Sequence, residues 1–187
     1  MKLACLLLLF AVPCSGAEGQ KKYEIRKNVV IHESVVAGTK VKVTVSEQPF
    51  DPDKHRVSEK SNFGTVENPR WEPTVDLRPV IGNSVETEGS LPPAGCPQLS
   101  RVAVHFGDVV VEVPQQLLSN VFFARLHSPG RFSLEYADSI VSVSSDAKCV
   151  LISLGVGEGG GQAEAFFAVS KDGQASDQRP TRELPGR

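Results

Sequence analysis

The sequence has few cysteines, few aromatic residues and no excess of either charge. Of its 187 residues four are cysteine and 6% are aromatic, and 20 Lys and Arg stand against 22 Asp and Glu. It also lacks a collagen-like glycine period and a heptad repeat. These absences exclude fibrous and coiled-coil proteins, disulfide-dense mini-proteins and strongly basic nucleic-acid-binding proteins. We therefore expect a soluble globular chain with no nucleic-acid partner, with room for one domain of usual size or a small domain with a tail.

Long apolar runs are missing as well. The longest of them, residues 3–12, follows Lys2 and is well short of the ~18 residues that span a bilayer. Small residues up to Ala17 come next, which is the pattern of a secretory signal peptide. We predict that residues 1–17 are removed by cleavage between Ala17 and Glu18, and that the mature chain is secreted, extracellular and without stable membrane insertion. An uncleaved signal anchor is the alternative.

Removal of the signal peptide would leave Cys96 and Cys149 as the two cysteines of the mature chain. An oxidising compartment favours a disulfide between them, and closing a loop of this length would destabilise the unfolded chain by about 4 kcal/mol. We predict this disulfide, with two buried free thiols as the alternative. No histidine lies near either cysteine at the spacing of a zinc site, and the four histidines are far apart in sequence. We expect no metal and no other cofactor.

Proline is concentrated in one segment, where no apolar period is sustained. Eight of the thirteen prolines lie between residues 49 and 97. Each proline removes a backbone donor and fixes one backbone angle, which prevents a long helix or a continuous strand ladder. We predict that residues 48–97 form an extended, irregular linker or a segment that wraps over a neighbouring surface. Arg70 and Trp71, the single tryptophan, are the candidate contacts with a partner, because Arg and Trp are frequent interface anchors; docking of Trp71 on its own core is the alternative.

Residues 18–47 show the pattern of a β-hairpin. Val41, Val43 and Val45 alternate with polar residues, and Ala37-Gly38 supplies a turn before them. A two-stranded hairpin alone is only marginally stable in water. We therefore predict that this hairpin packs on the main domain.

A second hairpin surrounds Gly107-Asp108, and its register can be checked. A two-residue loop with glycine first is typical of a type II′ turn between two strands. Three apolar pairs then share one face of the hairpin: Phe106 with Val109, Val104 with Val111, and Val102 with Val113. A slip of one residue would destroy this match, so the pattern specifies the register.

Further short strands follow between turn signals. They are expected over 121–126, 131–136, 140–143, 148–154 and 163–169. We predict an all-β fold, with an antiparallel β-sandwich or open barrel over 98–173 and a disordered polar tail over 174–187. An immunoglobulin-like arrangement stays open, although Ala147 replaces the tyrosine expected two residues before the second cysteine, and no tryptophan lies between the cysteines.

Two features could carry chemistry, and both have a simpler interpretation. Residues 155–160 read Gly-x-Gly-x-x-Gly after an apolar strand, as in dinucleotide-binding folds, but too few residues follow for a crossover helix and the next segment is typical of a strand. We interpret the glycine run as a hairpin loop. His55 and His105 are expected to face solvent. The sequence contains no Gly-x-Ser-x-Gly motif for a nucleophilic serine.

These patterns favour a secreted, non-catalytic protein that binds an extracellular or cell-surface protein through loops on a β-sandwich. One alternative is a precursor or self-assembling matrix component that is processed or assembled through residues 48–97, since valine-rich strands pair through uncovered edges. A small-ligand carrier or hydrolase is a third hypothesis, and it would require a pocket.

Overall fold

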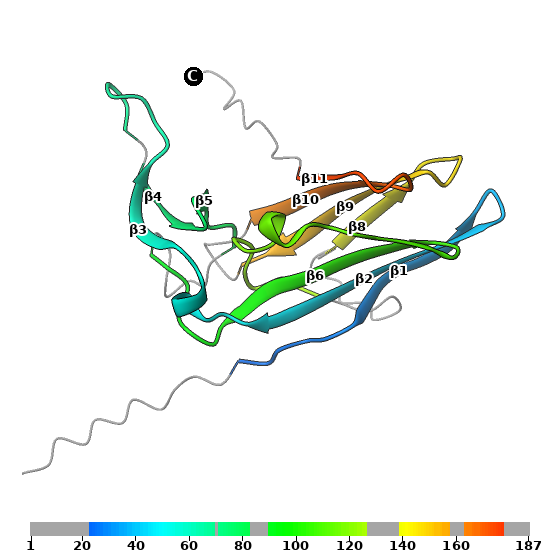
Figure 1. The fold of residues 1–187 in the computed structure, drawn as a ribbon, viewed down its shortest axis with the longest axis horizontal. Coiled ribbons are helices and arrows are strands. Elements are labelled where there is room, and N and C mark those ends of the chain that lie inside the picture. Colours follow the sequence, from blue (N-terminus) through cyan, green and yellow to red (C-terminus); the bar gives the residue numbers. More distant parts are fainter. Residues whose placement is uncertain (1–22, 70, 83–89, 127–138, 158–162, 178–187) are drawn as a thin grey trace, which may run out of the picture.

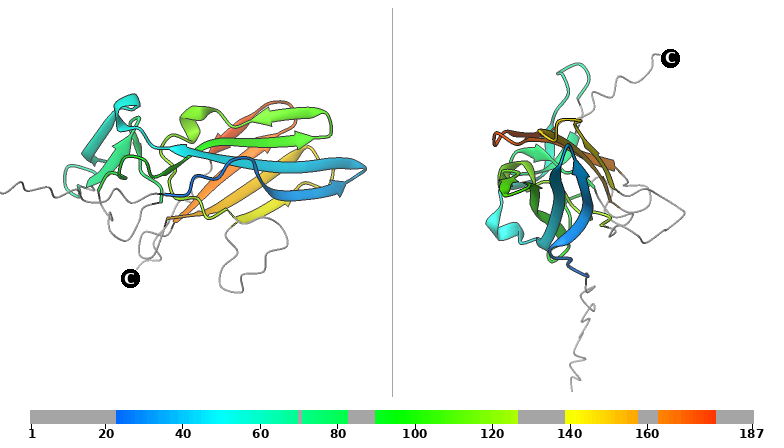
Figure 2. Two further views of the ribbon diagram at one scale, coloured as in Figure 1. Left: turned by 90° about the horizontal axis from the view of Figure 1, so that it is seen from below. Right: turned by 90° about the vertical axis from the view of Figure 1, so that its right-hand side faces the viewer.

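The computed structural model describes residues 23–69, 71–82, 90–126, 139–157 and 163–177. The described residues form three antiparallel sheets and contain no α-helix. Two four-stranded sheets lie face to face, and a smaller three-stranded sheet stands at one end of them (Figure 1 and Figure 2). The predicted all-β antiparallel sandwich is confirmed.

The first sheet has the strand order β1-β2-β6-β7, with the bounds β1 (Val29–Val36), β2 (Thr39–Pro49), β6 (Pro97–Phe106) and β7 (Val109–Glu112). Ala37 and Gly38 join β1 to β2 with φ of 48° and 75°, the pair of positive angles that a type I′ turn requires. β2 pairs with β6 along most of its length. The N-terminal hairpin is therefore part of the sandwich.

The register predicted for the hairpin β6–β7 is confirmed. Phe106 pairs with Val109 and Val104 with Val111, and the Val113 amide donates to the Val102 carbonyl at 2.9 Å. Of the six apolar side chains five are buried, and Val109, beside the turn, is exposed.

The second sheet has the order β11-β10-β9-β8, with the bounds β8 (Ser139–Val143), β9 (Cys149–Val156), β10 (Ala163–Ser170) and β11 (Ala175–Asp177). The strands expected over 140–143, 148–154 and 163–169 are confirmed. The tail was expected to be disordered from residue 174, but Ala175–Asp177 pair with β10; residues 178–187 lie outside the described part. The strands on either side of the glycine run, β9 and β10, are antiparallel neighbours, which agrees with its interpretation as a hairpin loop; residues 158–162 themselves lie outside the described part.

The strand expected over 121–126 is not regular. Its residues make isolated bridges, which join Val121 to Ile81, Phe122 to Gln98 and Ala124 to Val156. The partner strand expected over 131–136 lies outside the described residues.

The core fills the space between the two sheets. Alternate residues of β2 and β6 face inward as registered pairs, such as Val43 with Val104, and meet alternate residues of β9 and β10, such as Ile152 with Phe167. The described strands β8 to β11 follow one another within a single sheet. An immunoglobulin sandwich distributes its strands between sheets by Greek-key connections, so the immunoglobulin-like arrangement is not the one observed.

The proline-rich segment is more ordered than the sequence predicts. It contains a 3-10 turn, η1 (Pro52–Lys54), and a third sheet of order β3-β4-β5, with the bounds β3 (Val57–Asn62), β4 (Trp71–Val75) and β5 (Arg78–Pro79). Three of the prolines stand where no ladder hydrogen bond is lost. Pro52 begins η1, Pro97 begins β6, and Pro73 lies opposite a bulge between Ser58 and Ser61, which are the positions that tolerate proline.

The predicted disulfide between Cys96 and Cys149 is not formed, and both residues are free thiols. Cys96 packs beside Phe123, whose carbonyl accepts from the Gly157 amide at 2.9 Å just beyond the end of β9. Cys149 begins β9 at its other end, roughly 20 Å away at the ~3.3 Å rise of a strand residue. A disulfide requires Cα atoms within about 7 Å of each other.

Candidate functional site

Among the described residues, one hairpin projects from the sandwich (Figure 1). Strands β3 and β4 and the loop between them stand away from the sandwich in both Figure 1 and Figure 2. We call residues 57–75 the arm. Two local hydrogen bonds fold its tip: the Gly64 amide donates to Asn62 Oδ1 at 2.8 Å, and the Asn68 amide donates to Thr65 Oγ1 at 3.0 Å.

Large apolar side chains are exposed on the arm. Trp71 is 61% exposed, Phe63 44% and Val66 92%. The sequence prediction of Trp71 as a candidate contact is therefore compatible with its position, and its docking on the core is not observed. Arg70, the other candidate contact, lies outside the described residues. Exposed apolar groups gathered on a projecting element are typical of interaction sites.

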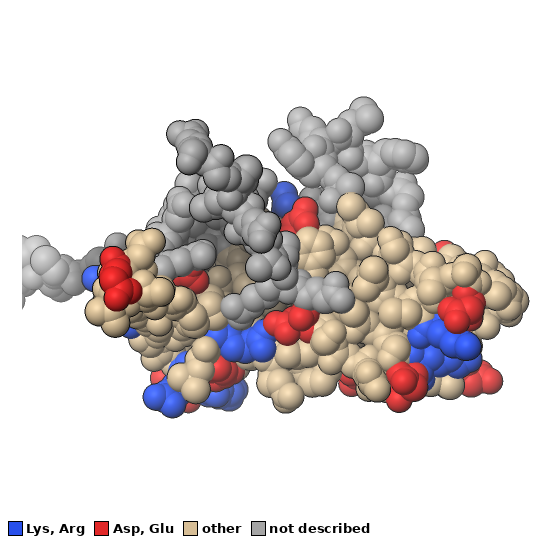
Figure 3. All heavy atoms as spheres, turned by 90° about the horizontal axis from the view of Figure 1, so that it is seen from above, with Lys and Arg blue, Asp and Glu red and all other residues tan. Residues whose placement is uncertain are grey.

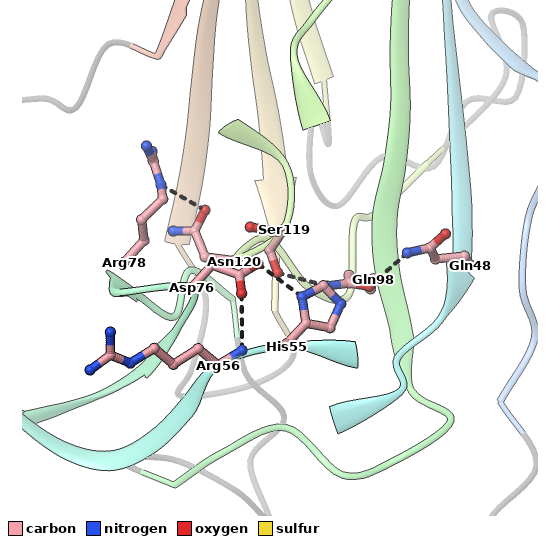
Figure 4. A network of polar contacts seen from close by, with 8 residues as sticks. All are labelled: Gln48, His55, Arg56, Asp76, Arg78, Gln98, Ser119 and Asn120. Carbon is pink, nitrogen blue, oxygen red and sulfur yellow. Dashed lines mark hydrogen bonds and ion pairs between the residues drawn. The ribbon is translucent and has the colours of Figure 1, made fainter. Parts of the chain in front are cut away.

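A polar network fixes the base of the arm to the sandwich (Figure 4). The centre of the network is His55, which the sequence prediction placed in solvent but which is largely buried. Its Nδ1 lies 2.9 Å from Asp76 Oδ2, and its Nε2 lies 3.2 Å from Gln98 Nε2. An amide nitrogen can only donate, so Nε2 accepts and the proton on Nδ1 is directed to Asp76.

Gln98, on β6, uses both side-chain amide protons and its amide oxygen in hydrogen bonds. Its Nε2 also donates to the Ser119 carbonyl at 2.7 Å, and its Oε1 accepts from Gln48 Nε2 at 2.9 Å. The residue is fully buried. Gln98 therefore links two strands of the sandwich to the base of the arm.

Asp76 closes the network from the arm side. It has a positive φ of 52°, and its Oδ1 accepts from the Arg56 amide at 3.1 Å. Burial opposes its ionisation, but the hydrogen bonds from His55 and the Arg56 amide outweigh burial and hold the pKa of Asp76 below its usual value. An ionised Asp76 thus holds the two sides of the hairpin base together.

A second set of contacts holds β5. Arg78 Nε donates to Asn120 Oδ1 at 3.3 Å, and Asn120 Nδ2 donates to the Pro79 carbonyl at 2.6 Å. Arg78 also forms an ion pair with Asp177 of β11. The arm is therefore anchored to both sheets of the sandwich. Because both ring nitrogens of His55 are engaged, we assign this network a positioning role.

A cavity of about 290 Å³ lies where residues 23–26 cross the end of β2. Glu47, at a bulge in β2, lines the cavity and is only 3% exposed. Its Oε2 accepts from the Arg26 amide at 3.1 Å. Burial raises the pKa of Glu47 to about 7, against the lowering effect of the hydrogen bond and charge of Arg26.

Sequence reasoning missed the residues of the network and of the cavity. In the sequence, Glu47 continues the inward phase of Val43 and Val45, and Gln98 shares the inward phase of Val102 and Val104. A polar residue in the inward phase of an alternating strand is therefore the signal that the sequence offers for both residues. Contacts between residues about 40 positions apart cannot be read from such local patterns.

Comparison of the chain with models of protein families, with curated proteins and with solved structures found no match. Within the described ranges, no group of three or more His, Cys, Asp or Glu is placed to hold a metal ion. In the same part of the chain, no helix is long and apolar enough to cross a bilayer. On the face seen in Figure 3, basic and acidic side chains lie in small mixed groups, with wide uncharged areas between them.

Proposed function

We propose that this protein is a secreted, non-catalytic binding protein that recognises an extracellular or cell-surface protein through the arm. The observation that supports the proposal is the 61% exposure of Trp71 on a projecting hairpin. Exposing an indole to water is unfavourable, and burying it in a pocket of a partner recovers that free energy. The partner would offer an apolar pocket of the size of one aromatic side chain.

The anchored base of the arm supports the same proposal. Binding is weakened when a loop must be ordered as the complex forms. The contacts of His55 and Arg78 with the sandwich hold the base of the hairpin before any partner is present. A preorganised element with one central aromatic side chain is the usual arrangement of an interface hot spot.

The test is binding of the fluorescently labelled protein to a panel of cell surfaces. We expect saturable binding to at least one cell type, and at least a tenfold loss of affinity in Trp71→Ala and in Val66→Ser. The matched control is Val35→Ser, because Val35 is 70% exposed on β1, away from the arm. Absence of saturable binding, or equal affinity of the arm variants and the control, would contradict the proposal.

Secretion depends on the sequence pattern of residues 1–17. Expression of the full chain in a eukaryotic culture tests it directly. The protein should appear in the medium with Glu18 as its first residue. Its retention in the cell with an intact N-terminus would contradict this part of the proposal.

Self-assembly is a second candidate function, favoured by exposed valines on the edge strands of the first sheet. Val35 on β1 is 70% exposed, and Val109 and Val110 on β7 are 41% and 47% exposed. An open edge presents unpaired backbone groups to another copy. Sedimentation over a concentration series distinguishes the two candidates: a stable monomer contradicts assembly, whereas growing species that Val110→Lys abolishes would support it.

A further inference from the structure

The open cavity beside Glu47 is lined by three separate parts of the chain. The Glu47 amide donates to the Arg26 carbonyl at 2.7 Å, and the Phe123 amide donates to the Pro97 carbonyl at 2.9 Å. The Arg26 guanidinium donates to the Leu126 carbonyl. The walls are therefore held by hydrogen bonds, and the cavity exists without a ligand. A volume of about 290 Å³ is at the lower end of the range of small-molecule sites.

One wall of the cavity is apolar. Tyr23 and Phe123 meet edge to face, with ring centroids 5.7 Å apart, and Pro97 lies beside them. Phe123 has a φ of 52°, a conformation that costs a residue with a side chain about 1–3 kcal/mol and recurs at ligand sites. The backbone thus holds an aromatic ring at the cavity under strain.

The cavity is lined by equal numbers of acidic and basic side chains. The acidic ones are Glu24 and Glu47, and the basic ones are Arg26 and Arg125. Arg26 Nε lies 3.9 Å from Glu24 Oε1, so this pair is mutually compensated at the rim. Glu47 and Arg125 are the other acidic and basic side chains that line the cavity.

Glu47 has unused capacity to accept hydrogen bonds. An ionised carboxylate has about four acceptor positions, and the structure shows the Arg26 amide as its single donor among the described residues. A buried carboxylate is costly unless it is paired. A cationic group entering the cavity would supply the missing partner.

We propose that this cavity binds a small zwitterion of the α-amino-acid class, with its ammonium group on Glu47, its carboxylate on Arg125 and its apolar side chain against Tyr23 and Phe123. A guanidinium has five donors, so Arg125 can receive a carboxylate and keep the contact that it already makes. The inference is independent of the arm and of the proposed protein partner.

Binding should release protons near neutral pH. The groups that face Glu47 are Tyr23, Glu24 and Arg26 from the N-terminal stretch, together with Arg125 and the buried Cys96 thiol. Burial raises the pKa of Cys96 to about 12, and that of Glu47 to about 7. An ammonium group beside Glu47 favours its ionised form, so the ligand displaces the proton.

The experiment is titration calorimetry of the full chain with three probes of matched shape. L-leucine carries both charges, 3-methylbutylamine lacks the carboxylate and 4-methylpentanoate lacks the ammonium group. We expect saturable binding of leucine, at least tenfold weaker binding of the other two, and a heat that differs between phosphate and Tris buffers because protons are released. Equal binding of the three probes, or no saturation by leucine at millimolar concentration, would overturn the proposal.

Two variants test the assigned residue. Glu47→Gln keeps the shape of the side chain and an oxygen acceptor for the Arg26 amide, and should weaken leucine binding at least tenfold and abolish the proton release. Glu112→Gln, on the exposed side of β7, should change neither. Circular dichroism is the control that each variant is folded. Unchanged leucine affinity in Glu47→Gln would place the ligand elsewhere and overturn the assignment.

Discussion

At the scale of single residues, one glycine stands where no other residue fits. Gly82 has a φ of 81°, and a Cβ added to it would overlap the Phe122 carbonyl oxygen and lie 2.9 Å from the Gly157 nitrogen. The close approach lets the backbone at Gly82 pass between the end of β9 and a small apolar cluster beside the main core. This cluster consists of Phe50, Val75, Cys96, Phe122 and Phe123. No sequence pattern marks this role, because Gly82 lies in the proline-rich segment, where glycine is expected for any turn.

We expect Gly82→Ala to lower the free energy of unfolding by about 3 kcal/mol or more, since it adds a steric overlap to the cost of a positive φ. Gly38→Ala is the matched control: Gly38 has a φ of 75°, but no atom lies within 4 Å of an added Cβ. The control should lose about 1–2 kcal/mol. Urea unfolding followed by circular dichroism measures both, and equal losses would refute the close approach.

Glu47 should make stability depend on pH. Its pKa is raised to about 7 in the folded chain and is ordinary, near 4.3, in the unfolded chain. Between these values the folded state binds the extra proton, so the free energy of unfolding falls as pH rises from about 4.5 to 8, by about 3 kcal/mol in all. Glu47→Gln should remove this slope, while Glu112→Gln retains it. A wild-type protein with constant stability over this range would contradict the expectation.

At the scale of elements, the sequence predicts the sandwich strands well and the arm poorly. The pairs of β6 and β7 follow from one alternating pattern and one glycine turn, which are local signals. The strands of the arm have no such pattern. Ser58 and Thr74 form a pair beside the bulge that lies opposite Pro73, and the contacts that anchor the arm come from the buried Gln98 and Asn120. Long-range polar contacts of this kind leave no periodic trace in a sequence.

Loss of Gln98 should loosen the arm. Gln98→Leu preserves volume but leaves Gln48, the His55 Nε2 and the Ser119 carbonyl without their partner, which we expect to cost about 2–3 kcal/mol. Relative to the wild type, the variant should show a larger increase in the hydrogen-exchange rates of the β3 and β4 amides than in those of the β9 amides. Gln116→Leu, at an exposed position, is the control and should change neither quantity. Unaltered exchange in the arm of Gln98→Leu would show that other contacts anchor it.

At the scale of the whole molecule, the two cysteines lie in different environments. Cys96 is fully buried in the small apolar cluster and Cys149 is half-buried at the start of β9. The sequence argument for a disulfide used only compartment and loop length. It could not include the length of β9, which separates the two residues.

The chain that cleavage after Ala17 would leave should contain two reactive thiols after unfolding and one before it. Iodoacetamide should label Cys149 in the native state, because Cys96 is inaccessible and burial raises its pKa to about 12. The intact mass should be the same with and without reduction. A gain of two hydrogens on reduction, or equal labelling of both cysteines in the native protein, would disagree with the fold.

The position of the single tryptophan has a spectroscopic consequence. Trp71 belongs neither to the core between the two sheets nor to the small apolar cluster around Cys96. Its indole is therefore in contact with water while the protein is folded. Its emission should therefore resemble that of the unfolded chain, and a denaturation curve recorded from it would stay nearly flat while circular dichroism reports the melting of the sandwich. The same emission should move to shorter wavelength when another surface covers the arm. The chain thus carries an optical probe that is silent to folding and sensitive to contact.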